Sequence, residues 1–133
     1  AEIYRCDEVA DDKMPAMGYV SVTRPGVSRG PHEHREQTDV FGFVGTGSLR
    51  IRMWDNREKS QTYGVTQTVE VGEVNSVIVA IPPGVVHGYR NISSVDAFVL
   101  NFPNRLYAGK GRKLPVDEIR YEDTGNTPFV MDN

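Results

Sequence analysis

The chain has 133 residues, of which 38% are hydrophobic and 25% are charged, and its formal net charge is −3 at pH 7. This length allows one domain with a single hydrophobic core. The weakly acidic balance disfavours nucleic acid or an acidic membrane as a partner. Cys6 is the only cysteine, so no disulfide framework is expected, and no apolar run is long enough to span a bilayer. A cytoplasmic protein is therefore expected.

Residues 1–18 are mixed in character and are expected to form an amino-terminal arm or an edge strand. Beyond them, seven segments carry β-branched, aromatic or alternating apolar residues and end at glycine, proline or polar turns. The clearest alternation places Leu49, Ile51 and Met53 on one face of a strand. The predicted strands cover residues 18–24, 38–44, 48–54, 64–71, 75–81, 86–91 and 97–102.

Short strands separated by glycine and proline at intervals of about ten residues are typical of an all-β barrel or sandwich. No window shows a sustained helical period, so one all-β domain is expected over residues 1–133. The polar tail, residues 104–133, is expected to hold a short helix near residues 116–121, or to lie along the barrel or a partner subunit. Because a small barrel with exposed strands often closes its edges with a second copy, a homodimer is expected.

All three histidines fall in two segments that begin with turn signals. His32 and His34 stand two residues apart after an Arg-Pro-Gly turn, and His87 follows a Pro-Pro-Gly turn. Residues i and i+2 of a strand point to the same face of the sheet. The pattern therefore predicts that the three imidazoles converge inside one barrel, with Asp39 nearby.

The segment Pro82-Pro-Gly-Val-Val-His-Gly-Tyr-Arg-Asn91 resembles the Pro-x-Gly-x-x-His-x-x-x-Asn motif of the cupin superfamily. The stretch from Pro25 to Gly47, with its two histidines and Asp39, is similar to the other cupin motif, although Asp stands where the superfamily usually has Glu. The resemblance implies a cupin double-stranded β-helix, a small jelly-roll barrel whose mouth holds the site.

More narrowly, the chain from residue 23 to residue 123 resembles the dTDP-4-dehydrorhamnose 3,5-epimerase family of cupins. The resemblance implies an epimerase or isomerase that acts on a nucleotide-diphosphate 4-keto-6-deoxy sugar. Such an enzyme removes a proton α to the keto group by acid–base chemistry, without a cofactor. The segments that carry the resemblance are Ser28-Arg-Gly-Pro-His32, Ile81-Pro-Pro-Gly-Val-Val-His-Gly-Tyr89, Asn101-Phe-Pro-Asn-Arg-Leu-Tyr107 and Val116-Asp-Glu-Ile-Arg-Tyr-Glu-Asp123.

By position, the resemblance makes His32 the catalytic base and Tyr107 the catalytic acid. Guanidinium groups bind phosphate oxygens in a bidentate way, so arginines beside the site are expected to face the diphosphate. A lysine that steadies the enolate oxygen in the family has no match in residues 38–43. Sugar 3,4-ketoisomerases share the Arg-Gly-x-His-x-His pattern of residues 29–34, so the epimerase and ketoisomerase outcomes both stay open. The substrate-binding residues implied are Arg24, Arg29, His34 and His87.

The same residues support two other hypotheses. In a metal-dependent cupin, one divalent ion such as Mn, Fe, Ni or Zn would be bound by His32, His34, Asp39 and His87, since imidazole suits all of these ions. In a carbohydrate-binding cupin, the fold would be kept without catalysis. The acidic residues of the tail are expected to be solvated surface in every case; they are Asp117, Glu118, Glu122 and Asp123.

Overall fold

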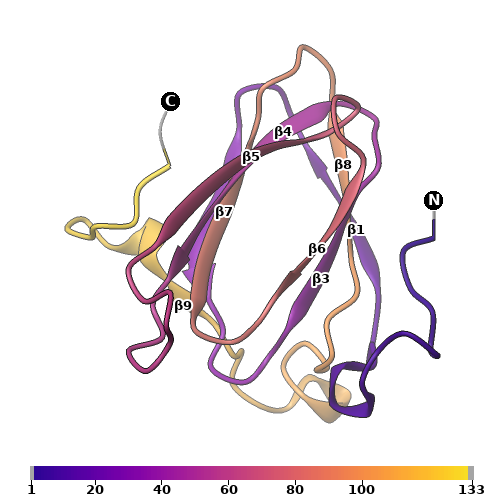
Figure 1. The fold of residues 1–133 in the computed structure, drawn as a ribbon, viewed down its shortest axis with the longest axis vertical. Helices are drawn as coiled ribbons and strands as arrows, with labels where there is room; N and C mark the ends of the chain where they lie inside the picture. Colours follow the sequence, from indigo (N-terminus) through magenta and orange to yellow (C-terminus); the bar gives the residue numbers. More distant parts are fainter. Residues whose placement is uncertain (1, 132–133) are drawn as a thin grey trace.

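The computed structural model of the chain describes residues 2–131, which form two facing antiparallel β-sheets (Figure 1). The strands are β1 (Tyr19–Thr23), β2 (Ser28–Glu33), β3 (Asp39–Phe43), β4 (Ser48–Asp55), β5 (Thr66–Gly72), β6 (Val77–Ile81), β7 (Val85–Asn91), β8 (Ala97–Asn101) and β9 (Ile119–Arg120). Short 3-10 turns are η1 (Asp11–Lys13), η2 (Lys110–Arg112) and η3 (Tyr121–Asp123). One sheet has the order β1-β8-β3-β6 and the other β5-β4-β7-β2-β9. The predicted all-β barrel is confirmed.

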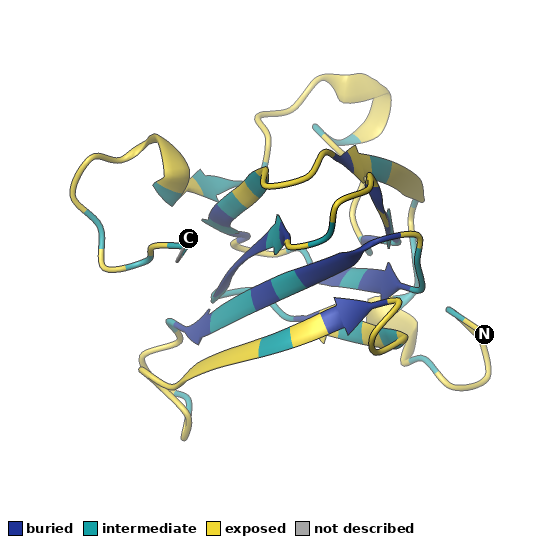
Figure 2. Ribbon diagram, turned by 90° about the horizontal axis from the view of Figure 1, so that it is seen from above, coloured by how far each residue is buried: buried dark blue, intermediate teal, exposed yellow. Residues whose placement is uncertain are grey.

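Each of the seven predicted strands is present, with ends within two residues of the predicted ones. The alternation that predicted them also separates the two faces of each sheet. In β8, for example, Ala97, Val99 and Asn101 are buried between the sheets, whereas Phe98 is exposed. Figure 2 shows that the buried positions lie on the strands, whereas the loops, most of the tail and much of β5 are exposed. The core residues are Phe41, Phe43, Leu49, Ile51, Val71, Ile81, Tyr89, Ala97 and Val99.

Strand β2 carries a one-residue bulge that places Arg29 and His32 on the same face. Arg29 pairs with Tyr89 and His32 pairs with His87, so β2 advances three residues while β7 advances two. An extra residue reverses the alternation of side chains, and both residues therefore point between the sheets. Gly30 in the bulge has a φ of +81°, and a Cβ atom there would lie 2.6 Å from the carbonyl oxygen of His87. Glycine fits this position because it has no Cβ.

The helix considered for residues 116–121 is absent from the structure. Residues 119 and 120 instead form β9, which pairs with Glu33 and His32 of β2 and is followed by the η3 turn. Two backbone pairs with β2 outweigh the weak helical preference of so short a segment. The alternative expectation, that the tail lies along the barrel, is confirmed by this pairing.

The end of the tail packs on the outer face of the five-stranded sheet. The hydroxyl of Tyr121 donates a hydrogen bond to the carboxylate of Glu33, which points away from the barrel interior. The ring of Phe129 lies 4.7 Å from that of Tyr121 and 5.8 Å from that of Trp54, measured between ring centroids. In Figure 1 the tail accordingly lies outside β7 and β9.

At the other end of the chain, residues 2–18 form an amino-terminal arm, one of the two arrangements expected from the sequence. These residues contain no strand. The side chain of Ile3 lies over Gly42 on the outer face of the four-stranded sheet. Between residues 2 and 131, no helix is long and apolar enough to cross a membrane.

Candidate active site

The three imidazoles converge between the two sheets, as the sequence predicts. His32 and His34 come from β2 and the residue that follows it, and His87 comes from the neighbouring strand β7. The ring centroid of His32 lies 5.5 Å from that of His34 and 4.7 Å from that of His87. The core fills the rest of the barrel, so the histidines form the polar end of its interior.

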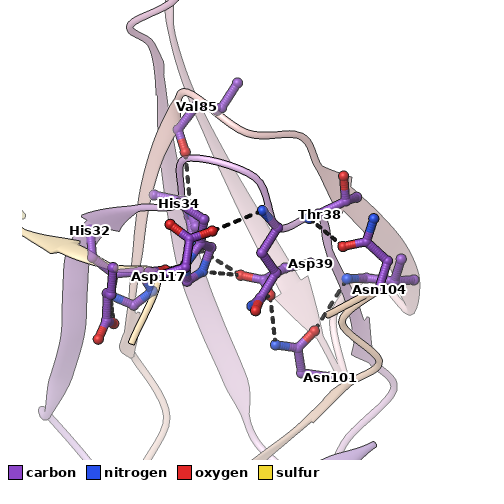
Figure 3. A network of polar contacts seen from close by, with 12 residues as sticks. His32, His34, Thr38, Asp39, Val85, Asn101, Asn104 and Asp117 are labelled. Atoms are coloured by element: carbon purple, nitrogen blue, oxygen red, sulfur yellow. Dashed lines mark hydrogen bonds and ion pairs between the residues drawn. The ribbon is translucent and has the colours of Figure 1, made fainter. Parts of the chain in front are cut away.

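Asp39, the first residue of β3, is the acceptor around which the polar groups gather (Figure 3). Its carboxylate accepts hydrogen bonds from Nε2 of His34 at 2.9 Å, Nε2 of Gln37 at 2.8 Å and Nδ2 of Asn101 at 3.1 Å. Nε2 of His87 lies 3.2 Å from the same carboxylate, without the alignment of a hydrogen bond. Burial alone would raise the pKa of Asp39, but the hydrogen bonds and the neighbouring positive charge hold it well below its usual range.

His34 is held as an imidazolium ion. Its Nε2 faces the carboxylate of Asp39, and its Nδ1 lies 2.5 Å from the backbone carbonyl oxygen of Asp117. Neither partner can donate a hydrogen, so both ring nitrogens of His34 must carry one. Burial opposes this charge, yet the bond to Asp39 raises the pKa of His34 to about 9.

His32 is neutral at pH 7. Burial, together with the neighbouring imidazoles, lowers its pKa to about 3. Its Nδ1 is buried without a hydrogen-bond partner, but two carboxylate oxygens lie close, at 3.4 Å on Glu118 and 3.7 Å on Glu122. A neutral imidazole can accept a proton, and carboxylates beside it stabilise the imidazolium ion that results.

Two cavities meet at His32. The larger, of about 530 Å³, opens toward the loop of residues 103–110, and the smaller, of about 330 Å³, lies between β1 and β2. Tyr19, His32 and Glu118 line both of them. Volumes of this size are usual for small-molecule sites.

The other residues implied by the sequence take different places. Tyr107 lines the larger cavity and is 54% exposed. Arg29 lines the smaller one, with its guanidinium bonded to Oγ1 of Thr23 at 3.1 Å and to the carbonyl oxygen of Val22 at 2.9 Å. Arg24 is exposed and lies outside the residues that line either cavity.

Comparison with known proteins identifies the family of the chain. The family model for dTDP-4-dehydrorhamnose 3,5-epimerase matches residues 1–122. The chain belongs to this family. The cupin resemblance seen in the histidine segments is thereby confirmed, and the chain is placed among sugar-nucleotide epimerases.

Three similar proteins support this placement. "Probable low-salt glycan biosynthesis epimerase Agl13" of Haloferax volcanii is 36% identical over 107 residues, covering 80% of this chain and 68% of the relative. "Spore coat polysaccharide biosynthesis protein SpsL" of Bacillus subtilis is 31% identical over 134 positions, covering 97% and 86%. The crystal structure of a dTDP sugar isomerase from Desulfovibrio desulfuricans G20 has a TM-score of 0.79 at 25% identity, covering 97% of this chain and 78% of that one.

The site of this family member contains residues that the sequence pattern did not single out. Asp117 and Glu118 were expected at the solvated surface, and that expectation is wrong, because both are half-buried and contact the histidines. The carboxylate of Asp117 also accepts three backbone N–H groups, from residues 35–37. Their position depends on the pairing of β9 with β2, which joins residues far apart in the sequence and leaves no local signal.

Donor type and spacing would also suit a divalent metal ion. His32, His34, Asp39 and His87 each offer one ligand atom, and these atoms lie within 4.8 Å of one another. A metal ligand must present a lone pair, however, and both nitrogens of His34 already donate to oxygen acceptors. For His34 to bind an ion through Nε2, the proton that this nitrogen donates to Asp39 would have to be lost, whereas the bond from Nδ1 to Asp117 could stay.

Proposed function

We propose that this epimerase-family protein inverts a carbon atom next to the keto group of a nucleotide-linked 4-keto-6-deoxy sugar, without a cofactor. The observation that carries the proposal is His32, a neutral imidazole at the junction of two cavities with two carboxylates behind its Nδ1. The acidity of hydrogens next to a carbonyl group makes proton removal the accessible first step. A buried base with a supporting carboxylate is the arrangement that this step needs.

In the first step, His32 removes the proton, and the electron pair of the C–H bond moves onto the keto oxygen. Only Nε2 of His32 can meet the substrate, since Nδ1 is buried against Glu118 and Glu122. The positive charge of His34, two residues away, favours the negative charge that develops on the oxygen. That charge offers one physical substitute for the lysine that has no match in this chain.

In the second step, a tyrosine returns a proton to the opposite face of the carbon. Two tyrosines line the cavities: Tyr107, which the family resemblance indicates for this role, and Tyr19. His87 completes the polar floor beside the keto group. The diphosphate needs positive charge at the cavity walls, which Arg29 supplies in the smaller cavity and Arg105 and Lys110 supply in the larger. A dTDP sugar is the first substrate to test, because the family description and the structural relative both name this nucleotide.

The proposal includes a homodimer. On the outer face of the four-stranded sheet, Val20 is 56% exposed, Val22 45% and Phe98 42%. The register places Val22 opposite Phe98 and Val20 opposite Leu100, so these side chains form one apolar surface. Large contiguous apolar surfaces are uncommon on monomers and typical of homodimer interfaces.

The proposed function is tested by incubating the protein with dTDP-4-keto-6-deoxyglucose in deuterium oxide. We expect deuterium to enter the position next to the keto group, and the inverted sugar to accumulate, as followed by NMR and mass spectrometry. Binding of dTDP, measured by calorimetry, without any exchange of deuterium would contradict catalysis and favour the carbohydrate-binding hypothesis.

A further inference from the structure

A second tyrosine, Tyr19, reaches the same space as His32. It lies at the amino-terminal end of β1, and its side chain lines both cavities together with His32 and Glu118. Tyr107, by contrast, lies in the loop that follows β8 and lines the larger cavity but not the smaller one. Tyr19 is therefore the tyrosine at the junction where the reacting carbon must sit.

The hydrogen bonds around Asn101 show whether the hydroxyl of Tyr19 donates or accepts in its bond to that residue. The side-chain oxygen of Asn101 accepts the backbone N–H of Val40 at 3.2 Å, which fixes the orientation of its amide. Its nitrogen then donates to the carboxylate of Asp39 at 3.1 Å and to the hydroxyl oxygen of Tyr19 at 2.9 Å. Tyr19 is the acceptor in this bond, and among residues 2–131 its hydroxyl makes no other hydrogen bond. Its own O–H hydrogen is thus available to a ligand in the cavity.

The two residues also stand on opposite walls of the barrel. Tyr19 belongs to the four-stranded sheet and His32 to the five-stranded sheet, and the cavities lie between them. Inversion at carbon requires a base on one face of the carbon and an acid on the other. We propose that Tyr19 is the catalytic acid that protonates the enolate on the face opposite His32, an inference that rests on the proposed function.

The proton balance of this step closes without a further reactant. The carbon–carbon double bond of the enolate takes the hydroxyl hydrogen of Tyr19, the C–H bond forms with inverted configuration, and the C=O bond is restored. The phenolate that remains is stabilised by the amide hydrogen of Asn101. Tyr19 is 46% exposed, so solvent can return its proton while His32 releases the one that it took. Burial raises the pKa of Tyr19, which keeps the hydroxyl protonated at neutral pH between turnovers.

The test compares Tyr19→Phe with Tyr107→Phe in deuterium oxide, using dTDP-4-keto-6-deoxyglucose. For Tyr19→Phe we expect deuterium exchange at the wild-type order of magnitude but a fall of at least about 10²-fold in the inverted product. The matched control is Tyr63→Phe, at a 54% exposed position outside the lining of both cavities, and it should keep exchange and inversion within a few-fold of wild type. Binding of dTDP by calorimetry and the melting temperature of each variant show whether the fold and the site are intact.

Each other outcome overturns the inference. If Tyr19→Phe inverts the sugar at the wild-type rate, or if Tyr107→Phe alone loses inversion, the acid is not Tyr19. Loss of exchange as well as inversion in Tyr19→Phe would assign Tyr19 to proton removal, a loss of dTDP binding would assign it to binding, and a lowered melting temperature would assign it to the fold. Absence of exchange in the wild type would overturn the proposed function itself, and is thereby distinguished from a failure of this inference alone.

Discussion

Nδ1 of His32 lies 3.4 Å from a carboxylate oxygen of Glu118, which directly precedes β9 and is far from the histidine segments in the sequence. The contact turns a buried nitrogen toward negative charge and leaves the other nitrogen for the substrate. It therefore links the tail of the chain to the chemistry at the mouth of the barrel.

Substitution of His32 by alanine is expected to lower deuterium exchange by about 10²–10⁴-fold, because a general base contributes a factor of this size. Binding of dTDP should change little, since dTDP itself carries no keto sugar on which His32 could act. Exchange is measured by NMR and binding by calorimetry. An exchange rate equal to that of the wild type would remove His32 from the role of base.

The double substitution Glu118→Gln, Glu122→Gln should slow exchange without a comparable change in KM. Glutamine keeps the size of the side chain but cannot stabilise the imidazolium ion, and misplacement of a base by about 1 Å costs up to roughly 10²-fold. We expect kcat to fall by about 10–10²-fold, and to recover in part in the variant Glu118→Asp, Glu122→Gln, which keeps one carboxylate. The matched control is Glu70→Gln. Glu70 lies on the edge strand β5, away from the histidines, and forms an exposed ion pair with Arg50 of β4. Equal effects of the control and the double variant would contradict the prediction.

The sequence predicts the strands well because each has one apolar face. In β4, for example, the alternating residues Leu49 and Ile51 are both buried between the sheets. The convergence of His32, His34 and His87 follows from the same periodicity and from the two turns that precede them. Local pattern and final position agree at these residues, because burial is what determines both.

The position of the tail beside the histidines could not be predicted from local periodicity. Asp117 and Glu118 look like ordinary surface acids, and only the pairing of residue 119 with Glu33 brings them to the histidines. The bulge that turns Arg29 inward is likewise invisible in the sequence, because it depends on how β2 is paired with β7. Long-range pairing, rather than local preference, determines these parts of the site.

Elemental analysis of the purified protein should find much less than one equivalent of Mn, Fe, Ni or Zn per chain. The reason is the double donation of His34 to Asp39 and to the carbonyl oxygen of Asp117, which leaves no lone pair for an ion. A His34→Ala variant is the control for adventitious metal. Close to one equivalent in the wild type that is lost in this variant would reverse the prediction and favour the metal-dependent hypothesis.

The homodimer should dissociate when charge enters the outer face of the four-stranded sheet. Val22→Glu places a carboxylate in the apolar surface formed with Phe98. Burying an unpaired charge at an interface costs several kcal/mol, which weakens association by orders of magnitude. Sedimentation velocity should show a dimer for the wild type and a monomer for this variant. Val74→Glu, at a 65% exposed position in the turn before β6, is the matched control and should stay dimeric. A monomeric wild type, or dissociation in both variants, would contradict the proposed interface.

His32 and His34 should shape the pH dependence of stability in opposite directions. The pKa of His32 is lowered from 6.5 to about 3, so the unfolded chain binds more protons between these values and stability falls as pH decreases below 6.5. Asp39, whose pKa is also lowered, adds to this loss below its ordinary value of 3.8. The pKa of His34 is raised from 6.5 to about 9, so its contribution is complete below 6.5 and is lost as pH rises through 9. Maximum stability is therefore expected near pH 6.5.

The test is urea unfolding at half-unit steps from pH 4 to pH 9.5. His34→Gln should flatten the loss of stability between pH 6.5 and pH 9, a loss whose upper limit is roughly 3 kcal/mol because about 1.4 kcal/mol accompanies each unit of pKa shift. His32→Gln should flatten the loss on the acid side and leave the alkaline side as it is in the wild type. The slope of free energy against urea concentration should stay constant, so that changes in the midpoint report stability alone. An alkaline loss that persists unchanged in His34→Gln would show that this histidine is not the buried cation on which Asp39 and the tail carbonyl of Asp117 converge.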